Sequence, residues 1–155
     1  MRRLNFFFAL FFACVAGPTL FAAETKVIKV LPTFLDQKGR QSLAPSLYER
    51  DAYQVQLRKN PKERSALRFD VQWKAKSKTV DWSKLKLRLE VRGVLGNEIR
   101  TQTLEQPATK KGWFSNWSAL TLSGEDFKKL GEMVSWRATL WEGDKQIAEQ
   151  KSFLW

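Results

Sequence analysis

The stretch LRFDVQWKAK, residues 67–76, decides the fold class of this chain. Apolar residues at 67, 69, 71, 73 and 75 alternate with polar or charged residues at the positions between them. Successive side chains of a β-strand point to opposite faces, so a period of two predicts a strand with one face in the core and the other in water. The stretch KLKLRLEVR, residues 84–92, repeats the pattern and predicts a second strand of the same kind.

Five further segments complete the predicted set of strands: residues 25–31, 98–105, 117–122, 134–140 and 146–155. Gly96-Asn97 precedes one of them and Glu142-Gly143-Asp144 precedes another, and these residues favour the tight turns of hairpins. Seven short strands separated by turn residues are typical of an antiparallel sandwich. We therefore expect an all-β fold, a seven-stranded antiparallel β-sandwich.

One segment departs from the β pattern. Ser46, with Glu49 three residues later, forms a capping-box pattern that predicts a short helix running as far as Asn60. Tyr48, Ala52 and Val55 share one helical face, which we expect to lie against the sandwich. Residues 34–65 thus form a helix-containing insertion between the first two strands, and insertions of this length often carry a scaffold's specific contacts.

The strand spacing of residues 66–155 resembles that of immunoglobulin-like and fibronectin type III-like domains. The resemblance is carried by LTLSG at residues 120–124, followed by Phe127, Gly131 and the sequence VSW at 134–136. The Cys…Trp…Cys hallmark of true immunoglobulin domains is absent, and Phe127 stands in the corner region where they have a tyrosine. The resemblance implies an immunoglobulin-like scaffold used mostly for binding and spacing, and it does not by itself assign a function.

The N-terminus carries an export signature. Arg2 and Arg3 precede a Phe-rich apolar run over residues 4–16, and Ala22 and Ala23 offer a cleavage site. We predict that residues 1–23 are a secretory signal peptide and that residues 24–155 form a single periplasmic or extracellular domain without a transmembrane span. Two alternatives stay open: an uncleaved N-terminal anchor formed by residues 4–23, and a lipoprotein acylated at Cys14.

The residue inventory excludes most catalytic chemistry. The chain has no histidine, and its one cysteine lies within the predicted signal, so no His-based triad, zinc site or disulfide is expected in residues 24–155. The only S-x-x-K match, Ser83 to Lys86, opens a predicted strand, where residues three apart point to opposite faces. We therefore expect a non-enzymatic protein without a cofactor or a metal, with paired carboxylates as the remaining catalytic alternative.

Tryptophan is unusually frequent, with seven residues in the chain. Trp73 and Trp136 are in phase with apolar neighbours and are expected in the core, whereas Trp141 is expected on an outer face. The candidate site residues are Lys110, Lys111, Trp113 and Trp117, because indole rings can stack on sugars or bases and lysines attract anions. The alternative is that Trp113 and Phe114 plug one end of the sandwich.

The charge of the chain is strongly basic. When Arg2 and Arg3 are left out, 25 of the 27 basic residues remain beside 16 acidic residues, so the net charge is about +9. If consecutive strands belong to opposite sheets, this charge is spread over both outer faces and favours loose association with polyanions rather than specific nucleic-acid recognition. The first expectation is an interaction or accessory module with a protein partner in the envelope or extracellular space; the alternative is binding of an acidic glycan or other polyanion.

Overall fold

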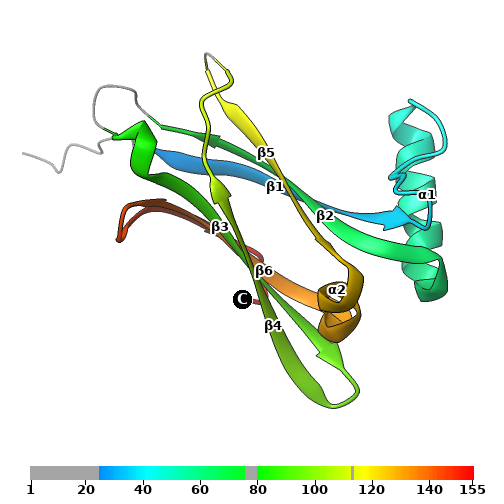
Figure 1. Ribbon diagram of the computed structural model, residues 1–155. Coiled ribbons are helices and arrows are strands. Elements are labelled where there is room, and N and C mark those ends of the chain that lie inside the picture. Colours follow the sequence, from blue (N-terminus) through cyan, green and yellow to red (C-terminus); the bar gives the residue numbers. More distant parts are fainter. Residues whose placement is uncertain (1–24, 76–79, 113) are drawn as a thin grey trace, which may run out of the picture.

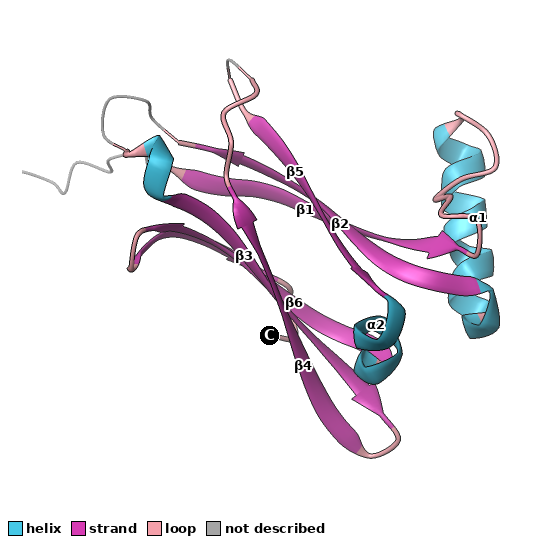
Figure 2. Ribbon diagram, in the orientation of Figure 1, coloured by secondary structure: helices cyan, strands magenta, loops and turns pink. Residues whose placement is uncertain are grey.

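The computed structural model describes residues 25–75, 80–112 and 114–155. Within them the chain forms seven strands in two antiparallel sheets, packed face to face as a β-sandwich, together with two α-helices (Figures 1 and 2). The expected seven-stranded antiparallel sandwich is thereby confirmed. The predicted signal peptide, residues 1–23, lies outside the described residues, and its boundary at residue 24 stays a prediction.

Strand order assigns the strands to sheets of three and four. The three-stranded sheet has the order β1-β2-β5 and comprises β1 (Lys26–Asp36), β2 (Arg64–Lys74) and β5 (Asn116–Ser123). The four-stranded sheet has the order β4-β3-β6-β7 and comprises β4 (Glu98–Pro107), β3 (Leu85–Leu95), β6 (Glu132–Glu142) and β7 (Lys145–Lys151). Because β2 and β3 are in opposite sheets, the basic residues that alternate along them do lie on two different outer faces.

The core lies between the two sheets and includes the inward residues that the alternation predicted, together with Tyr53, Leu57, Ala108 and Leu130, which it did not. Phe69 and Trp73 of β2 and Leu87 and Leu89 of β3 are completely buried. Burial of one such side chain contributes about 1.5–3 kcal/mol relative to leaving it in water. Trp73 is therefore the core residue expected from the sequence, and Trp136 is partly buried against the same cluster. The single buried donor of the Trp73 ring is satisfied, because its Nε1 donates to Ser118 Oγ at 3.0 Å.

Several strand boundaries, and the register of one strand, differ from the prediction. β1 continues through Pro32 to Asp36, so the insertion spans residues 37–63 instead of 34–65. A proline is tolerated there because β1 is an edge strand and needs only half of its N–H groups for the ladder. β7 ends at Lys151, not at Trp155. In β6 the register shifts beside Arg92, so Val134 is exposed and not in the core.

Two helices are present where one was expected. α2 (Gly124–Leu130) follows β5 directly and contacts β2, β3, β4 and β5, so it closes one end of the space between the sheets (Figure 2). Two short 3-10 turns, Pro61–Glu63 and Trp82–Lys84, precede β2 and β3.

Helix α1 (Leu47–Lys59) has the predicted bounds but the opposite orientation. Tyr53, Gln54 and Leu57 are buried against the sandwich, whereas Tyr48 is 84% exposed and Val55 is 45% exposed. The predicted contact face therefore points to solvent. The capping box is also not formed, because Ser46 is the N-cap residue but its side chain makes no capping hydrogen bond.

The sandwich has two different ends. α1 and α2 lie at one end, beyond the C-terminal part of β1 and the start of β2 (Figure 1). At the other end lie the start of β1, the connections from β2 to β3 and from β4 to β5, and the β6–β7 turn (Figure 1). We call this second end the loop end. Of the candidate residues of the sequence analysis, Lys110, Lys111 and Trp117 belong to the loop end.

Candidate functional site

The loop that joins β4 to β5 is held in place by one buried side chain. Asn116 is buried, and its Oδ1 accepts hydrogen bonds from the backbone N–H groups of Lys111 at 2.7 Å and Gly112 at 2.9 Å. Gln72 of β2 donates from Nε2 to Ser115 Oγ at 3.0 Å. The backbone of the loop is therefore anchored, while the side chains of Lys110 and Lys111 stay exposed to solvent.

The structure places the predicted site residues on two adjoining surfaces. Lys110 Nζ lies 5.7 Å from the ring centroid of Trp82, within the range of a cation–π contact. Trp117 is 45% exposed and stands opposite Gln72 in the pairing of β2 with β5. Its neighbour Phe114 is 87% exposed, so it does not plug the sandwich end as one expectation had it. Trp113 lies outside the described residues.

Trp82 is a member of this site that the sequence analysis missed. Its ring centroid lies 6.1 Å from that of Trp73, so it covers the end of the core. It also meets Lys110, although the two residues are far apart in the chain. The contact follows from the pairing of β3 with β4, which the sequence does not show: Leu95 pairs with Glu98 and Lys86 with Pro107, and the same register continued places Lys110 opposite Ser83, next to Trp82.

Asp81 and Glu142, two acidic residues at the loop end, are already engaged in hydrogen bonds. Asp81 accepts hydrogen bonds from Ser83 N and Oγ, and these bonds lower the pKa of its carboxyl group. Lys84 Nζ lies 3.3 Å from the same carboxylate, and Glu142 Oε1 accepts the backbone N–H of Asp81 at 2.6 Å. The Ser83 hydroxyl therefore donates to the Asp81 carboxylate and does not form a Ser-Lys pair with Lys86.

The outward face of α1 forms a second candidate surface. Leu47, Tyr48 and Val55 are exposed on the helix, and Leu43 is exposed in the segment before it. We call these four residues together with Ala52 the α1 stripe. Isolated apolar residues on a surface are ordinary, but a contiguous apolar patch marks an interaction site more often than chance allows.

The orientation of α1 buries Tyr53 and Leu57 in the core, and it is also held by Gln54, whose carboxamide pairs with the backbone of the edge strand β1. Phe34 N–H donates to Gln54 Oε1 at 2.8 Å, and Gln54 Nε2 donates to Phe34 O at 2.9 Å. The same nitrogen also donates to Gln41 O at 2.9 Å. The side chain thus takes the place of a neighbouring strand at Phe34 and covers this part of the β1 edge.

A buried carboxylate fixes the start of the insertion. Asp36 accepts hydrogen bonds from Lys38 N, Arg40 N, Arg40 Nε and Tyr53 Oη, each at 2.8 Å. Burial by itself would raise the pKa of Asp36, but the hydrogen bonds from Arg40 and Tyr53 outweigh it and hold the pKa well below its usual range. The same hydrogen bond, together with burial, raises the pKa of Tyr53.

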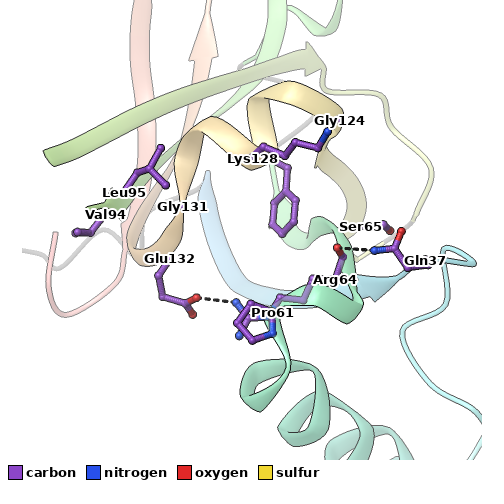
Figure 3. A pocket seen from close by; sticks show the side chains of 11 residues that line it. Gln37, Pro61, Arg64, Ser65, Val94, Leu95, Gly124, Lys128, Gly131 and Glu132 are labelled. Carbon is purple, nitrogen blue, oxygen red and sulfur yellow. Dashed lines mark hydrogen bonds and ion pairs between the residues drawn. The ribbon is translucent and has the colours of Figure 1, made fainter. Parts of the chain in front are cut away.

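A cavity of about 480 Å³ lies beside α2 and is also lined by the start of β2, the end of β3, the start of β6 and the 3-10 turn at Pro61 (Figure 3). Its buried charge is Arg64, which pairs with Glu132 at 2.7 Å and donates to the carbonyl oxygens of Leu57 and Arg58 at the end of α1. Arg64 also stacks on Phe34, with its Cζ 4.2 Å from the ring centroid. The guanidinium therefore caps α1 and is not free to bind a ligand.

The outer face of the four-stranded sheet is covered by stacked arginine and tryptophan side chains. Arg88 Cζ lies 4.5 Å from the Trp141 ring centroid, which confirms that Trp141 is on an outer face. Arg92 Cζ lies 3.8 Å from the Trp155 centroid, and Arg137 Cζ lies 5.1 Å from it. Arg88 and Arg137 also pair with Glu105 and Glu90. These contacts leave a solvated and largely neutralised face.

In the part of the chain that the structure describes, no group of three or more acidic, His or Cys side chains is placed to hold a metal ion. No helix there combines the length and the apolar character that crossing a membrane requires. Comparison with protein-family models, curated proteins and solved structures finds no match to this chain. The candidate functions therefore rest on the loop end and on the α1 stripe.

Proposed function

We propose that this protein is an exported, non-enzymatic β-sandwich that serves as a protein interaction or accessory module, and that α1 is its partner-binding element. The observation that carries the proposal is the outward orientation of the α1 stripe. A helix that presents apolar residues to solvent along one side is the form in which helix-in-groove recognition operates. Tyrosine is among the residue types enriched in such contacts, and Tyr48 lies at the most exposed part of the stripe.

The fold supports a finer assignment within the same proposal. In a constant-type immunoglobulin domain, the fourth strand pairs with the fifth. Here β4 pairs with β3 in the four-stranded sheet. We propose on this basis that the sandwich is of the fibronectin type III-like kind, a scaffold on which loops and insertions supply the specificity.

Strand addition is the less favoured route to a partner at the β1 edge. Gln54 already pairs with Phe34 there, and Pro32 has no N–H group to offer. A partner strand could not form a continuous ladder along β1 without displacing α1. Binding to the outward face of α1 requires no such rearrangement.

The test is site-specific photo-crosslinking in cells that export the protein. A photoreactive phenylalanine analogue replaces Tyr48 in one variant and Phe153, an equally accessible aromatic residue in the C-terminal tail, in a second. We expect a discrete adduct from position 48 that persists when the cells are lysed at high salt. Position 153 should yield no adduct of the same mass.

A matched pair of substitutions distinguishes the α1 stripe from exposed apolar surface in general. Val55→Asp places a charge in the stripe, whereas Ile99→Asp places one on an exposed β-branched residue of β4. The adduct should be lost in the first variant and retained in the second. An adduct that is absent from both positions, or that both substitutions weaken equally, would refute the α1 assignment.

The second candidate function is recognition of a carbohydrate or polyanion by Lys110, Lys111, Trp113 and Trp117. It is supported by Lys110 above the Trp82 ring and by the exposure of Phe114 and Trp117. An anionic ligand at this loop should change tryptophan fluorescence, and the change should be lost in Trp117→Ala. Titration with a soluble sulfated glycan provides the measurement, and an unaltered spectrum at saturating glycan would remove this candidate for glycans.

A further inference from the structure

The loop end combines lysines with exposed aromatic side chains. Its exposed members are Lys26 at the start of β1, Lys84 before β3, Lys110, Lys111 and Phe114 in the β4–β5 loop, Trp117 of β5 and Lys145 at the β6–β7 turn. They come from five different places in the sequence. The two sheets bring them to one end of the molecule, as Figure 1 shows for the elements that carry them.

The pairing of the strands establishes this proximity. In the three-stranded sheet, Lys26 pairs with Lys74 and Trp73 pairs with Asn116, so the β4–β5 loop enters β5 beside the end of β2, and the start of β1 lies on the other side of β2. In the four-stranded sheet, Glu142 is opposite Leu85 at the start of β3. Contacts between Trp73 and Trp82 and between Lys110 and Trp82 connect the two sheets at this end.

The electrostatic balance at the loop end is positive. Five lysines at this end, Lys26, Lys84, Lys110, Lys111 and Lys145, outnumber its three acidic residues. Asp81 is bound by Ser83 and Lys84, Glu142 accepts the backbone N–H of Asp81, and Asp144 is exposed beside Lys145. Lys110 and Lys111 are exposed and adjacent in the chain. Lysines gathered at one end attract an anionic surface, and near a surface that carries anionic lipid each contributes a factor of about five in affinity.

The aromatic residues specify what kind of anionic surface fits. Phe114 is 87% exposed, three residues beyond Lys111, and projects from a loop whose backbone Asn116 holds in place. A soluble polyanion has no apolar layer in which a phenyl ring could be buried. A bilayer offers phosphates at its surface and an acyl boundary just below, where aromatic side chains are enriched.

We infer that the loop end docks on an anionic phospholipid membrane, with Phe114 entering the headgroup region and Lys110 and Lys111 over the lipid phosphates. The inference rests on the second candidate function, which it makes specific by naming the polyanion. The described chain begins at Thr25, beside the loop end, and the apolar residues 4–23 precede it in the sequence. Whether that segment is cleaved or retained as an anchor, the loop end is the part of the domain nearest to it in the chain.

The test is vesicle binding by the protein without residues 1–23. All residues of the core lie between Val27 and Leu140, so this protein retains the whole core. Cosedimentation is measured with vesicles of phosphatidylglycerol and phosphatidylcholine, and with phosphatidylcholine alone. We expect binding to the first and at least a tenfold weaker association with the second, decreasing as salt is raised.

Matched variants separate the two contributions. Phe114→Ala should weaken binding to the anionic vesicles on the order of tenfold, while Phe153→Ala, an equally exposed phenylalanine away from the loop end, should leave it unchanged. The double substitution Lys110→Gln and Lys111→Gln should weaken it about 25-fold at low salt. Lys59→Gln with Lys62→Gln, at the end of α1, is the charge-matched control.

The outcomes distinguish this inference from the functions on which it builds. Binding of soluble heparin without binding of vesicles, or vesicle binding that Phe114→Ala does not weaken, would overturn the membrane assignment and leave polyanion recognition standing. Absence of binding to heparin and vesicles alike would overturn both. Neither result concerns the α1 stripe, because the crosslinking experiment uses residues at the opposite end of the sandwich.

Discussion

Replacing Gln54 by alanine tests the contact that positions the insertion on the sandwich. The substitution removes the hydrogen bonds of the carboxamide with Phe34 N, Phe34 O and Gln41 O. Alanine is at least as good a helix former as glutamine, so helix propensity does not contribute to the loss. The change therefore isolates the pairing of α1 with the β1 edge.

The magnitude follows from what is left behind. Each hydrogen bond contributes about 0.5–1.5 kcal/mol net, and a buried backbone group left without a partner costs about 1–3 kcal/mol. Gln54 is 4% exposed, so water reaches the freed groups of Phe34 only if α1 moves away. Such movement limits the cost, and we expect the free energy of unfolding to fall by about 2–4 kcal/mol.

Gln56→Ala provides the matched control, because Gln56 is an exposed glutamine on the same helix. Its Nε2 donates to Glu63 Oε2 at 3.1 Å on the surface, and its loss should change the free energy of unfolding by no more than about 0.5 kcal/mol. Urea denaturation of both variants gives the free energies from the midpoints if the slopes agree. Hydrogen exchange of the Phe34 amide reports the local effect.

A refutation would take a definite form. If the two variants unfold at the same urea concentration and the Phe34 amide exchanges at the parental rate in both, Gln54 does not hold α1 on the strand edge. If Gln54→Ala alone is destabilised, its newly uncovered edge should also promote concentration-dependent self-association, since an unpaired strand edge is a template for another strand. Sedimentation velocity at several protein concentrations measures that second effect.

Three further predictions concern stability. The pKa of Asp36 is held below its usual range, so the contribution of its carboxylate to the free energy of unfolding is fully present above the unfolded pKa of about 3.9 and is lost as the pH falls toward the folded value. The destabilisation caused by Asp36→Asn should therefore shrink below about pH 4. Urea titrations that give the same destabilisation at pH 7 and at pH 3 would contradict this. Gly131 has φ of 75°, and a Cβ at this position would lie 2.2 Å from Val94 O. Gly131→Ala should therefore lower the free energy of unfolding by about 2 kcal/mol or more, which calorimetry would detect. An unchanged melting temperature would argue against this backbone conformation. Trp155→Ala should cost about 1 kcal/mol through loss of the stack on Arg92, and Trp155→Phe should recover part of it in the same urea assay.

The strand pattern could be predicted because it is local. Alternation along β2 and β3 is imposed by the geometry of an extended chain, and each inward residue had to find a core, as Phe69 and Leu89 do. The turns at Gly96 and Gly143, both with positive φ, are local as well. For the same reason, the bounds of α1 could be predicted from its caps and its composition.

The face of α1 could not be predicted because it depends on a partner distant in the chain. The spacing of Tyr48, Ala52 and Val55 indicates an apolar side, but the burial of Tyr53 and Leu57 together with the hydrogen bonds of Gln54 favours the opposite side. The N–H and C=O groups of Phe34 at the strand edge are both satisfied by a single polar side chain, that of Gln54. Hydrophobic periodicity, which counts apolar residues, gives no indication of such a contact.

By itself, the sequence determined the alternating strands, the turns between them, the helical insertion and the basic, histidine-free composition, because each depends on residues close together in the chain or on composition alone. Only the tertiary structure decided which residues gather at the loop end, that Trp82 meets Lys110, that Phe114 is exposed and that the α1 stripe faces solvent. The first two features arise from the pairing of strands that are far apart in the chain. The orientation of α1 arises because buried hydrogen bonds and apolar burial together decide which side of the helix faces the sandwich.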